Sequence, residues 1–229
     1  MSRRSYRQYC ALAKALDVVG ERWTLLMIRE LMLGPRRYRD LLENLPGMGT
    51  NLLATRLKEM EASGMIEKVR AANRERAQAY RLAERGRALE SVIRGLVQWG
   101  VGLLGTPSEN ECSRPEWDLV AFRMLFRPEL AQKVDGIYAL LADELELFVR
   151  VEGGRVELLE EIPTGQRPIE IRGPGLLLRA LILGDAHPSE VFAGKELVIK
   201  GSRRQAKRFF QCFRDPARDG LWPRGGDDA

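Results

Sequence analysis

The residues after the turn at 46–49 are of the types that hydrogen-bond to bases and phosphates. Leu53, Leu57 and Met60 recur at helical spacing, which predicts a helix with one buried face and Thr50 as its N-cap. On the opposite face, Asn51 and Thr55 are the candidates for base contact. The candidates for phosphate contact are basic residues on this helix and near it: Arg37, Arg56, Lys58, Arg74 and Arg76.

The elements expected around this helix form a small helical domain that ends in a hairpin. Apolar periodicity predicts helices over 9–19, 22–33 and 37–44, and Gly34-Pro35 ends the second of them. Short strands are expected over 65–69 and 79–82, with a basic loop at 70–76 between them. A basic hairpin beside such a helix is typical of a wing that contacts the DNA backbone or minor groove. Each feature alone is usually a solvated surface, so the interpretation rests on their order and shared charge.

The charge is divided unequally along the 229 residues. Residues 1–105 hold 19 Lys and Arg against 11 Asp and Glu, a net charge of +8, whereas residues 106–229 hold 18 against 21, a net charge of −3. This contrast predicts two domains, of which only the first meets a polyanion.

A set of residues spread over 10–100 matches one family pattern. These are Cys10, Leu16, Gly20, Trp23, Thr24, Arg29, Leu31, Gly34, the run 37–41, Pro46, Gly47, Leu53, Arg56, Leu57, Met60, Gly64, Tyr80, Leu82, Gly86 and Trp99. With them the segment resembles the HxlR-type winged helix-turn-helix regulators of bacteria. Ala11 stands where the family commonly has proline, and Ala83 where it has threonine. The resemblance implies a transcriptional regulator that binds double-stranded DNA as a homodimer, on a two-fold symmetric operator.

The sequence itself offers an apolar stripe for a dimer. Residues 84–104 are expected to be helical, and the stripe could pack against the first helix of a second copy. The predicted dimer residues are Leu12, Leu16, Val92, Leu96, Trp99 and Leu103. A contact with the second half of the same chain is the alternative.

Cys10 supports a second hypothesis. Some members of the family sense oxidants or electrophiles through a cysteine near the N-terminus, and Arg7 and Lys14 could stabilise a thiolate here. The alternative, which we favour, is a small buried residue that packs the first helix. Cys10, Cys112 and Cys212 are widely spaced, which predicts neither a disulfide framework nor a zinc site.

The second half resembles a sterol-carrier-protein-type domain over 118–214, after a linker at 106–117 and before a loose tail at 215–229. The resemblance rests on strands expected over 137–142, 145–152, 155–161 and 169–172, then on the apolar run 176–184, the segment 187–201 and a last helix over 202–214. The expected fold class is thus α+β, a winged helix-turn-helix domain at 1–105 followed by an α/β sandwich with a mainly antiparallel sheet. Such domains hold a hydrophobic ligand in several members. The candidate pocket residues are Leu145, Leu147, Val149, Leu158, Ile171, Leu177, Leu181, Phe192, Phe209 and Phe213, which equally describe a filled core.

The sequence gives little support for catalysis. It contains no paired nucleophile and base, glycine-rich phosphate loop or metal-ligand cluster, so we expect no enzyme activity, cofactor or metal. His187, the single histidine, precedes a proline and is expected in a turn.

No apolar run reaches about 18 residues and no signal-peptide pattern is present, which predicts a cytoplasmic protein. We therefore expect a regulator whose second domain binds a hydrophobic effector. The alternatives are redox sensing through Cys10 and a lipid carrier.

Overall fold

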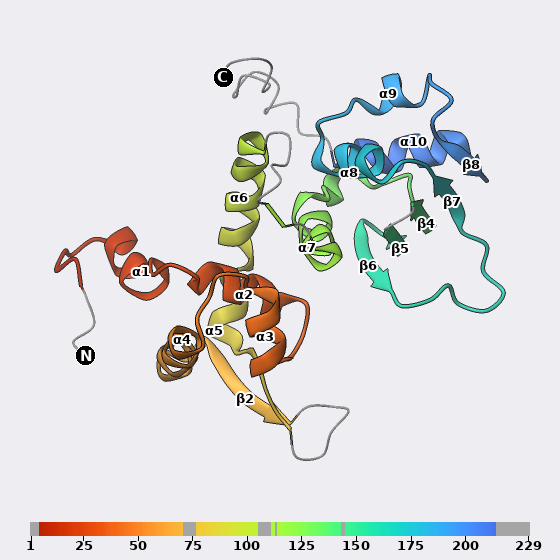
Figure 1. Ribbon diagram of the computed structural model, residues 1–229. Helices are drawn as coiled ribbons and strands as arrows, with labels where there is room; N and C mark the ends of the chain where they lie inside the picture. Colours follow the sequence, from red (N-terminus) through yellow and green to blue (C-terminus); the bar gives the residue numbers. More distant parts are fainter. Residues whose placement is uncertain (1–4, 71–76, 105–110, 113, 143–144, 214–229) are drawn as a thin grey trace. The chain divides into compact units, whose positions relative to one another are not determined.

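The computed structural model describes residues 5–70, 77–104, 111–112, 114–142 and 145–213 (Figure 1). The chain forms two compact units, 1–93 and 94–229, which are described separately. The sequence placed the domain boundary at 105, but the division falls within helix α6 (Glu90–Gly100). The cause is the packing of Val97 and Val101 into the core of the second unit. The predicted phosphate contacts Arg74 and Arg76 and the tail at 215–229 lie outside the described residues.

The first unit combines helices with a three-stranded antiparallel sheet of order β1-β3-β2. Its elements, before α6, are α1 (Ala11–Val19), α2 (Thr24–Met32), β1 (Arg36–Arg37), α3 (Tyr38–Asn44), α4 (Thr50–Ala62), β2 (Ile66–Arg70), β3 (Gln78–Leu82) and α5 (Glu84–Arg87). The order of helices and hairpin expected from the sequence is confirmed. The N-cap of α4 was predicted wrongly, because Gly49 occupies that position and Thr50 is the first helical residue.

The core of the first unit lies between α2, α3, α4 and the β2–β3 hairpin. Fully or nearly fully buried side chains come from each of these elements: Met27, Ile28, Leu31, Leu41, Leu53, Leu57, Met60, Ile66, Ala79 and Leu82. By contrast, α1 buries Ala13 alone, and it projects from the body of the unit in Figure 1. The fold of the unit therefore fixes α4 firmly and α1 weakly.

The helix expected over 84–104 is broken into three parts: α5, α6 and a 3-10 turn at Val101–Leu103. The first part is held by a close backbone approach. A Cβ added at Gly86 would lie 2.2 Å from the carbonyl oxygen of Met65, so only glycine fits there. The backbone amide of Ala83 also donates to that carbonyl at 2.9 Å. These contacts dock α5 on the start of β2, so it does not continue straight into α6.

The second unit contains a five-stranded sheet of order β6-β5-β4-β7-β8. Its elements are α7 (Pro115–Leu125), a 3-10 turn (Pro128–Leu130), β4 (Gly136–Ala142), β5 (Leu145–Glu152), β6 (Arg155–Leu159), β7 (Ile169–Arg172), α8 (Gly175–Leu183), α9 (Pro188–Val191), β8 (Val198–Lys200) and α10 (Arg203–Gln211). Among the strands that the structure describes in this unit, β4 and β7 form the one parallel pair. The prediction of a mainly antiparallel sheet with helices is thus confirmed. Helix α7, however, begins inside the segment predicted as linker.

An aromatic cluster fills the core of the second unit. The rings of Tyr138 and Phe209 stack with centroids 4.1 Å apart, and Phe122 lies 4.7 Å from Phe213. The hydroxyl of Tyr138 donates to the carbonyl of Val134 at 2.6 Å, which satisfies its buried polar group. Helices α7 and α10 are therefore joined to β4 by ring contacts.

Candidate nucleic-acid interface

Helix α4 presents its polar residues to solvent and its apolar residues to the core, as the sequence predicts. Thr50, Asn51, Thr55 and Lys58 are exposed. The hydroxyl of Thr55 donates to the carbonyl of Asn51 at 2.9 Å, so its oxygen remains available to accept a hydrogen bond. The hydroxyl of Tyr38 donates to the carbonyl of Thr50 at 2.7 Å and so ties α3 to the start of α4. The candidate base-contacting face is thus rigidly held.

Arg56 lies in a different environment from the rest of the predicted site. Its side chain is only 16% exposed and pairs with Glu21 at 2.7 Å and with Glu59 at 2.5 Å. Glu21 precedes α2, so this arginine links the α1–α2 turn to α4. The sequence predicted a phosphate contact for Arg56. In the structure its guanidinium forms ion pairs with Glu21 and Glu59 inside the first unit.

The same turn contains a strained residue. Trp23 has a backbone φ of +82°, a left-handed conformation that residues other than glycine rarely adopt. Its ring lies 3.7 Å from where a Cβ on Gly47 would be, in the turn before α4, and the guanidinium of Arg22 lies 5.3 Å from its ring centroid. Trp23 therefore packs near the turn that precedes α4, and Arg56 connects α4 itself to Glu21.

Arg37 also forms an ion pair within the first unit, with Asp40. The carboxylate of Asp40 accepts from its guanidinium at 2.8 Å and from its backbone amide at 2.9 Å, which satisfies the first turn of α3. The hydrogen bond from this guanidinium holds the pKa of the Asp40 carboxyl below its ordinary value. Arg37 is about 40% exposed at its side chain, so it can still reach an external anion.

Other cations near the hairpin divide into paired and unpaired ones. Lys68 pairs with Glu61 at 2.8 Å and Arg81 with Glu67 at 2.8 Å. Lys58 and Arg70 are exposed, and neither has an ion pair within the part of the chain that the structure describes. Sequence reasoning did not select Arg70, although its place at the end of β2, beside the wing loop, was a usable signal. It also passed over Leu52, an exposed apolar side chain on α4.

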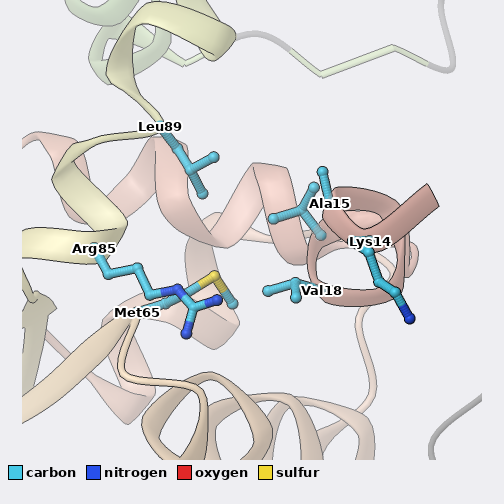
Figure 2. Close-up of a pocket in the computed structure, with 7 residues that line it drawn as sticks. Lys14, Ala15, Val18, Met65, Arg85 and Leu89 are labelled. Carbon is cyan, nitrogen blue, oxygen red and sulfur yellow. The ribbon is translucent and has the colours of Figure 1, made fainter. Parts of the chain in front are cut away.

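Two open cavities adjoin α1. One, of about 1070 Å³, separates α1 and the N-terminal segment from α4, and Asn51, Thr55 and Glu59 are among its lining residues. The other has about 290 Å³ (Figure 2). In Figure 2, Leu89, Met65 and Arg85 face Ala15 and Val18 across the space. Both cavities belong to the first unit, where the sequence predicted no ligand site.

The predicted dimer residues are all exposed in the single chain: Leu12, Leu16, Val92, Leu96, Trp99 and Leu103. Cys10 directly precedes α1 and is also exposed, so the expectation that it packs inside the chain is wrong. Cys112 is exposed as well, whereas Cys212 is buried, and burial raises the pKa of the Cys212 thiol to about 11.

The candidate ligand residues of the second unit lie together in its core. Leu147, Val149, Ile171, Leu181, Phe192, Phe209 and Phe213 belong to one buried cluster, with Leu158 and Leu177 packed against it; the side chain of Leu145 lies outside the description. His187 caps α9, because its Nδ1 accepts from the backbone amide of Ser189 at 3.1 Å. This confirms the expectation of a turn residue.

The described residues contain no group of three or more His, Cys, Asp or Glu side chains arranged to hold a metal ion. Among the helices within the described ranges, none has the length and apolar character needed to cross a bilayer.

Comparison with known proteins gives the family. Residues 18–106 match the profile described as HxlR-like helix-turn-helix. The HTH-type transcriptional regulator YodB of Bacillus subtilis is 33% identical over 88 residues, which are 38% of this chain and 79% of YodB. The chain belongs to the HxlR-like helix-turn-helix family.

The chain spans less than two thirds of the length of some curated relatives. An uncharacterized HTH-type transcriptional regulator of Mycobacterium tuberculosis, Rv3095, is 39% identical over 97 residues, so the match spans 42% of this chain and 61% of that relative. Among solved structures, reduced YodB from B. subtilis has a TM-score of 0.37 at 29% identity, covering 44% of this chain and all of that one. A quinone-bound YodB gives a TM-score of 0.34 at 32% identity, covering 39% of this chain and 93% of that one.

Proposed function

We propose that this chain is a transcriptional regulator that binds operator DNA as a homodimer through α4 and the β2–β3 hairpin. The observation that carries the proposal is the outer face of α4, where exposed Asn51, Thr55 and Lys58 stand opposite the buried stripe. An amide and a hydroxyl are suited to base edges, and an ammonium is suited to phosphates. Membership of a helix-turn-helix family supports the same interpretation.

The test is fluorescence anisotropy of the full chain on DNA from upstream of its own gene, compared with scrambled DNA at several salt concentrations. Lys58→Gln should weaken binding to both DNAs and reduce the salt slope by about one for each bound subunit. Asn51→Ala should weaken operator binding by about 1–3 kcal/mol and leave scrambled DNA unaffected, because a base contact carries the sequence information. Lys133→Gln, an exposed cation of the second unit, is the control. Equal affinity of the wild type for operator and scrambled DNA would refute the proposal.

We also propose that the second unit binds a hydrophobic effector. Its mainly antiparallel five-stranded sheet and the helices of the same unit agree with the likeness to sterol-carrier domains, several of which hold a hydrophobic ligand. We infer that a hydrophobic effector bound there shifts operator affinity. A fluorescent fatty acid titrated into the protein, with and without operator, tests this. Binding of the fatty acid with no change in operator affinity would exclude the coupling.

A second candidate function is redox or electrophile sensing. The exposed Cys10 thiol, directly before the exposed apolar residues of α1, favours it. Oxidation there would alter the surface that the dimer is proposed to use. Cys10→Ser should abolish the effect of diamide on operator binding, with Cys112→Ser as the matched control. An unchanged response in Cys10→Ser would remove this candidate.

A further inference from the structure

Helix α10 of the second unit carries a concentrated positive face. Its nine residues contain four cations and no acidic residue, although residues 106–229 as a whole have a net charge of −3. Arg203, Arg204, Lys207 and Arg208 follow an i, i+1, i+4, i+5 spacing, which places them on one side of the helix. The net charge of residues 106–229 alone therefore does not reveal that these four cations lie together on α10.

The opposite side of α10 anchors the helix. Ala206, Phe209 and Phe210 are fully buried, and both phenylalanine rings contact other aromatic rings of the core. The hydroxyl of Ser202 accepts from the amide of Gln205 and caps the first turn. The four cations are therefore carried by a helix that is anchored in the core.

Within the described residues, the cationic face of α10 is not neutralised by acidic side chains. Arg204, Lys207 and Arg208 make no ion pair within the described part of the chain. Glu129, which acts electrostatically on Cys212 next to the end of α10, is already bound by Arg127 at 2.7 Å. Like charges three and four residues apart destabilise a helix, so these cations repel one another along α10. An external polyanion would remove that repulsion.

Arg203 differs from its neighbours. Its guanidinium donates to the backbone carbonyl of Phe192 at 2.6 Å and lies 5.5 Å from the centroid of the Phe192 ring. Because Phe192 directly follows α9, Arg203 joins α10 to α9. The side chains left for an external ligand are Arg204, Lys207 and Arg208. They span about 6 Å of helix axis, which is comparable to two successive phosphates of a DNA strand at about 3.4 Å each.

We propose that the Arg204–Lys207–Arg208 face of α10 is a second, sequence-independent DNA-binding surface that contacts the phosphate backbone. It adds to the proposed function, on which it rests for the presence of DNA. Among polyanions, DNA is favoured because the same chain carries the α4 face. A membrane is less suited, because the apolar side of α10 is buried in the core and cannot insert.

The experiment compares two variants of the full chain that have equal net charge. Arg204→Gln/Lys207→Gln/Arg208→Gln removes the face, and Lys133→Gln/Arg155→Gln/Arg167→Gln removes three exposed cations elsewhere in the same unit. Anisotropy on operator and scrambled DNA is measured from low to physiological salt. The α10 variant should reduce the salt slope by up to about 2.7 for each bound subunit, because each phosphate contact contributes about 0.9. It should weaken both DNAs alike, and the control should keep the wild-type slope.

Each other outcome has a distinct meaning. Equal slopes for the two variants would overturn the α10 proposal, and Lys58→Gln would still report on the proposed function. An α10-dependent slope without preference for operator would instead refute the proposed function alone. Loss of binding to phosphatidylserine vesicles with an unchanged DNA slope would assign the face to a membrane and overturn the proposal. Thermal unfolding controls for folding, because relief of like-charge repulsion should leave the Tm of the α10 variant unchanged or raise it.

Discussion

Arg56 and Lys58 are two residues apart on α4, but they have different surroundings. Arg56 is held by Glu21 and Glu59, whereas Lys58 extends into solvent. From the sequence both were candidates for phosphate contact, because the decisive partner, Glu21, is 35 residues away along the chain. Spacing within a helix could identify the exposed face but not this long-range ion pair.

Replacement of these two residues should therefore affect different properties. Arg56→Gln should lower the free energy of unfolding by about 1–2 kcal/mol, because hydrogen bonds to charged partners are lost in a mostly buried position. Lys58→Gln should change it by less than about 0.5 kcal/mol. Urea unfolding followed by circular dichroism measures both. Equal stabilities of the two variants would contradict the assignment of Arg56 to the fold.

Reactivity should separate the three cysteines. Cys10 and Cys112 are exposed and should react with Ellman's reagent in the native protein. Cys212 is buried, and its raised pKa of about 11 keeps the thiol protonated at neutral pH. The double variant Cys10→Ser/Cys112→Ser should release no colour until denaturant is added. Rapid reaction of that variant under native conditions would show that the end of α10 opens.

At the scale of the element, the first turn of α3 depends on one carboxylate. Asp40 accepts from both the backbone amide and the guanidinium of Arg37. Asp40→Asn should lower the free energy of unfolding by about 1 kcal/mol at pH 7. Glu43→Gln, which removes an exposed pair with Arg39, is the control and should have almost no effect.

The effect of Asp40→Asn should depend on pH. The folded-state pKa of Asp40 is lowered, so its contribution is present above the unfolded value of about 3.9 and is lost as the pH falls through the folded value. The stabilities of wild type and Asp40→Asn should therefore converge in acid. A constant difference from pH 7 to acid would show that the charge of Asp40 is irrelevant.

Elements with a clean period could be predicted closely, and elements fixed by tertiary contact could not. The strand at 145–152 was predicted to the residue, because alternation of buried and polar residues marked it. Helix α7 was missed because its start, Pro115, lies inside the segment interpreted as a linker, although proline suits the first turn of a helix. The break near Ala88 follows from the docking of Gly86 on Met65, which no local pattern shows.

At the scale of the whole molecule, the exposed apolar residues of α1 and α6 predict self-association. Leu12→Glu and Leu96→Glu should each shift the mass measured by light scattering from dimer toward monomer, because a buried unpaired charge opposes association. Operator affinity should fall with it, since a monomer presents one α4. Leu176→Glu, which changes an exposed leucine on α8, is the control. A wild-type protein that is monomeric at micromolar concentration would exclude the dimer.

The parallel pairing of β4 with β7 has a consequence for the order of folding. The antiparallel strands β4, β5 and β6 are consecutive and can form as a local meander, but the other edge of β4 is completed only when β7 arrives about 30 residues later. During synthesis, Tyr138 and Leu140 on β4 therefore precede by some seventy residues the α10 phenylalanines that cover the core. In that interval an apolar strand edge is open to pairing with other chains. The second unit should thus be the part of the molecule that most needs protection from aggregation before synthesis is complete.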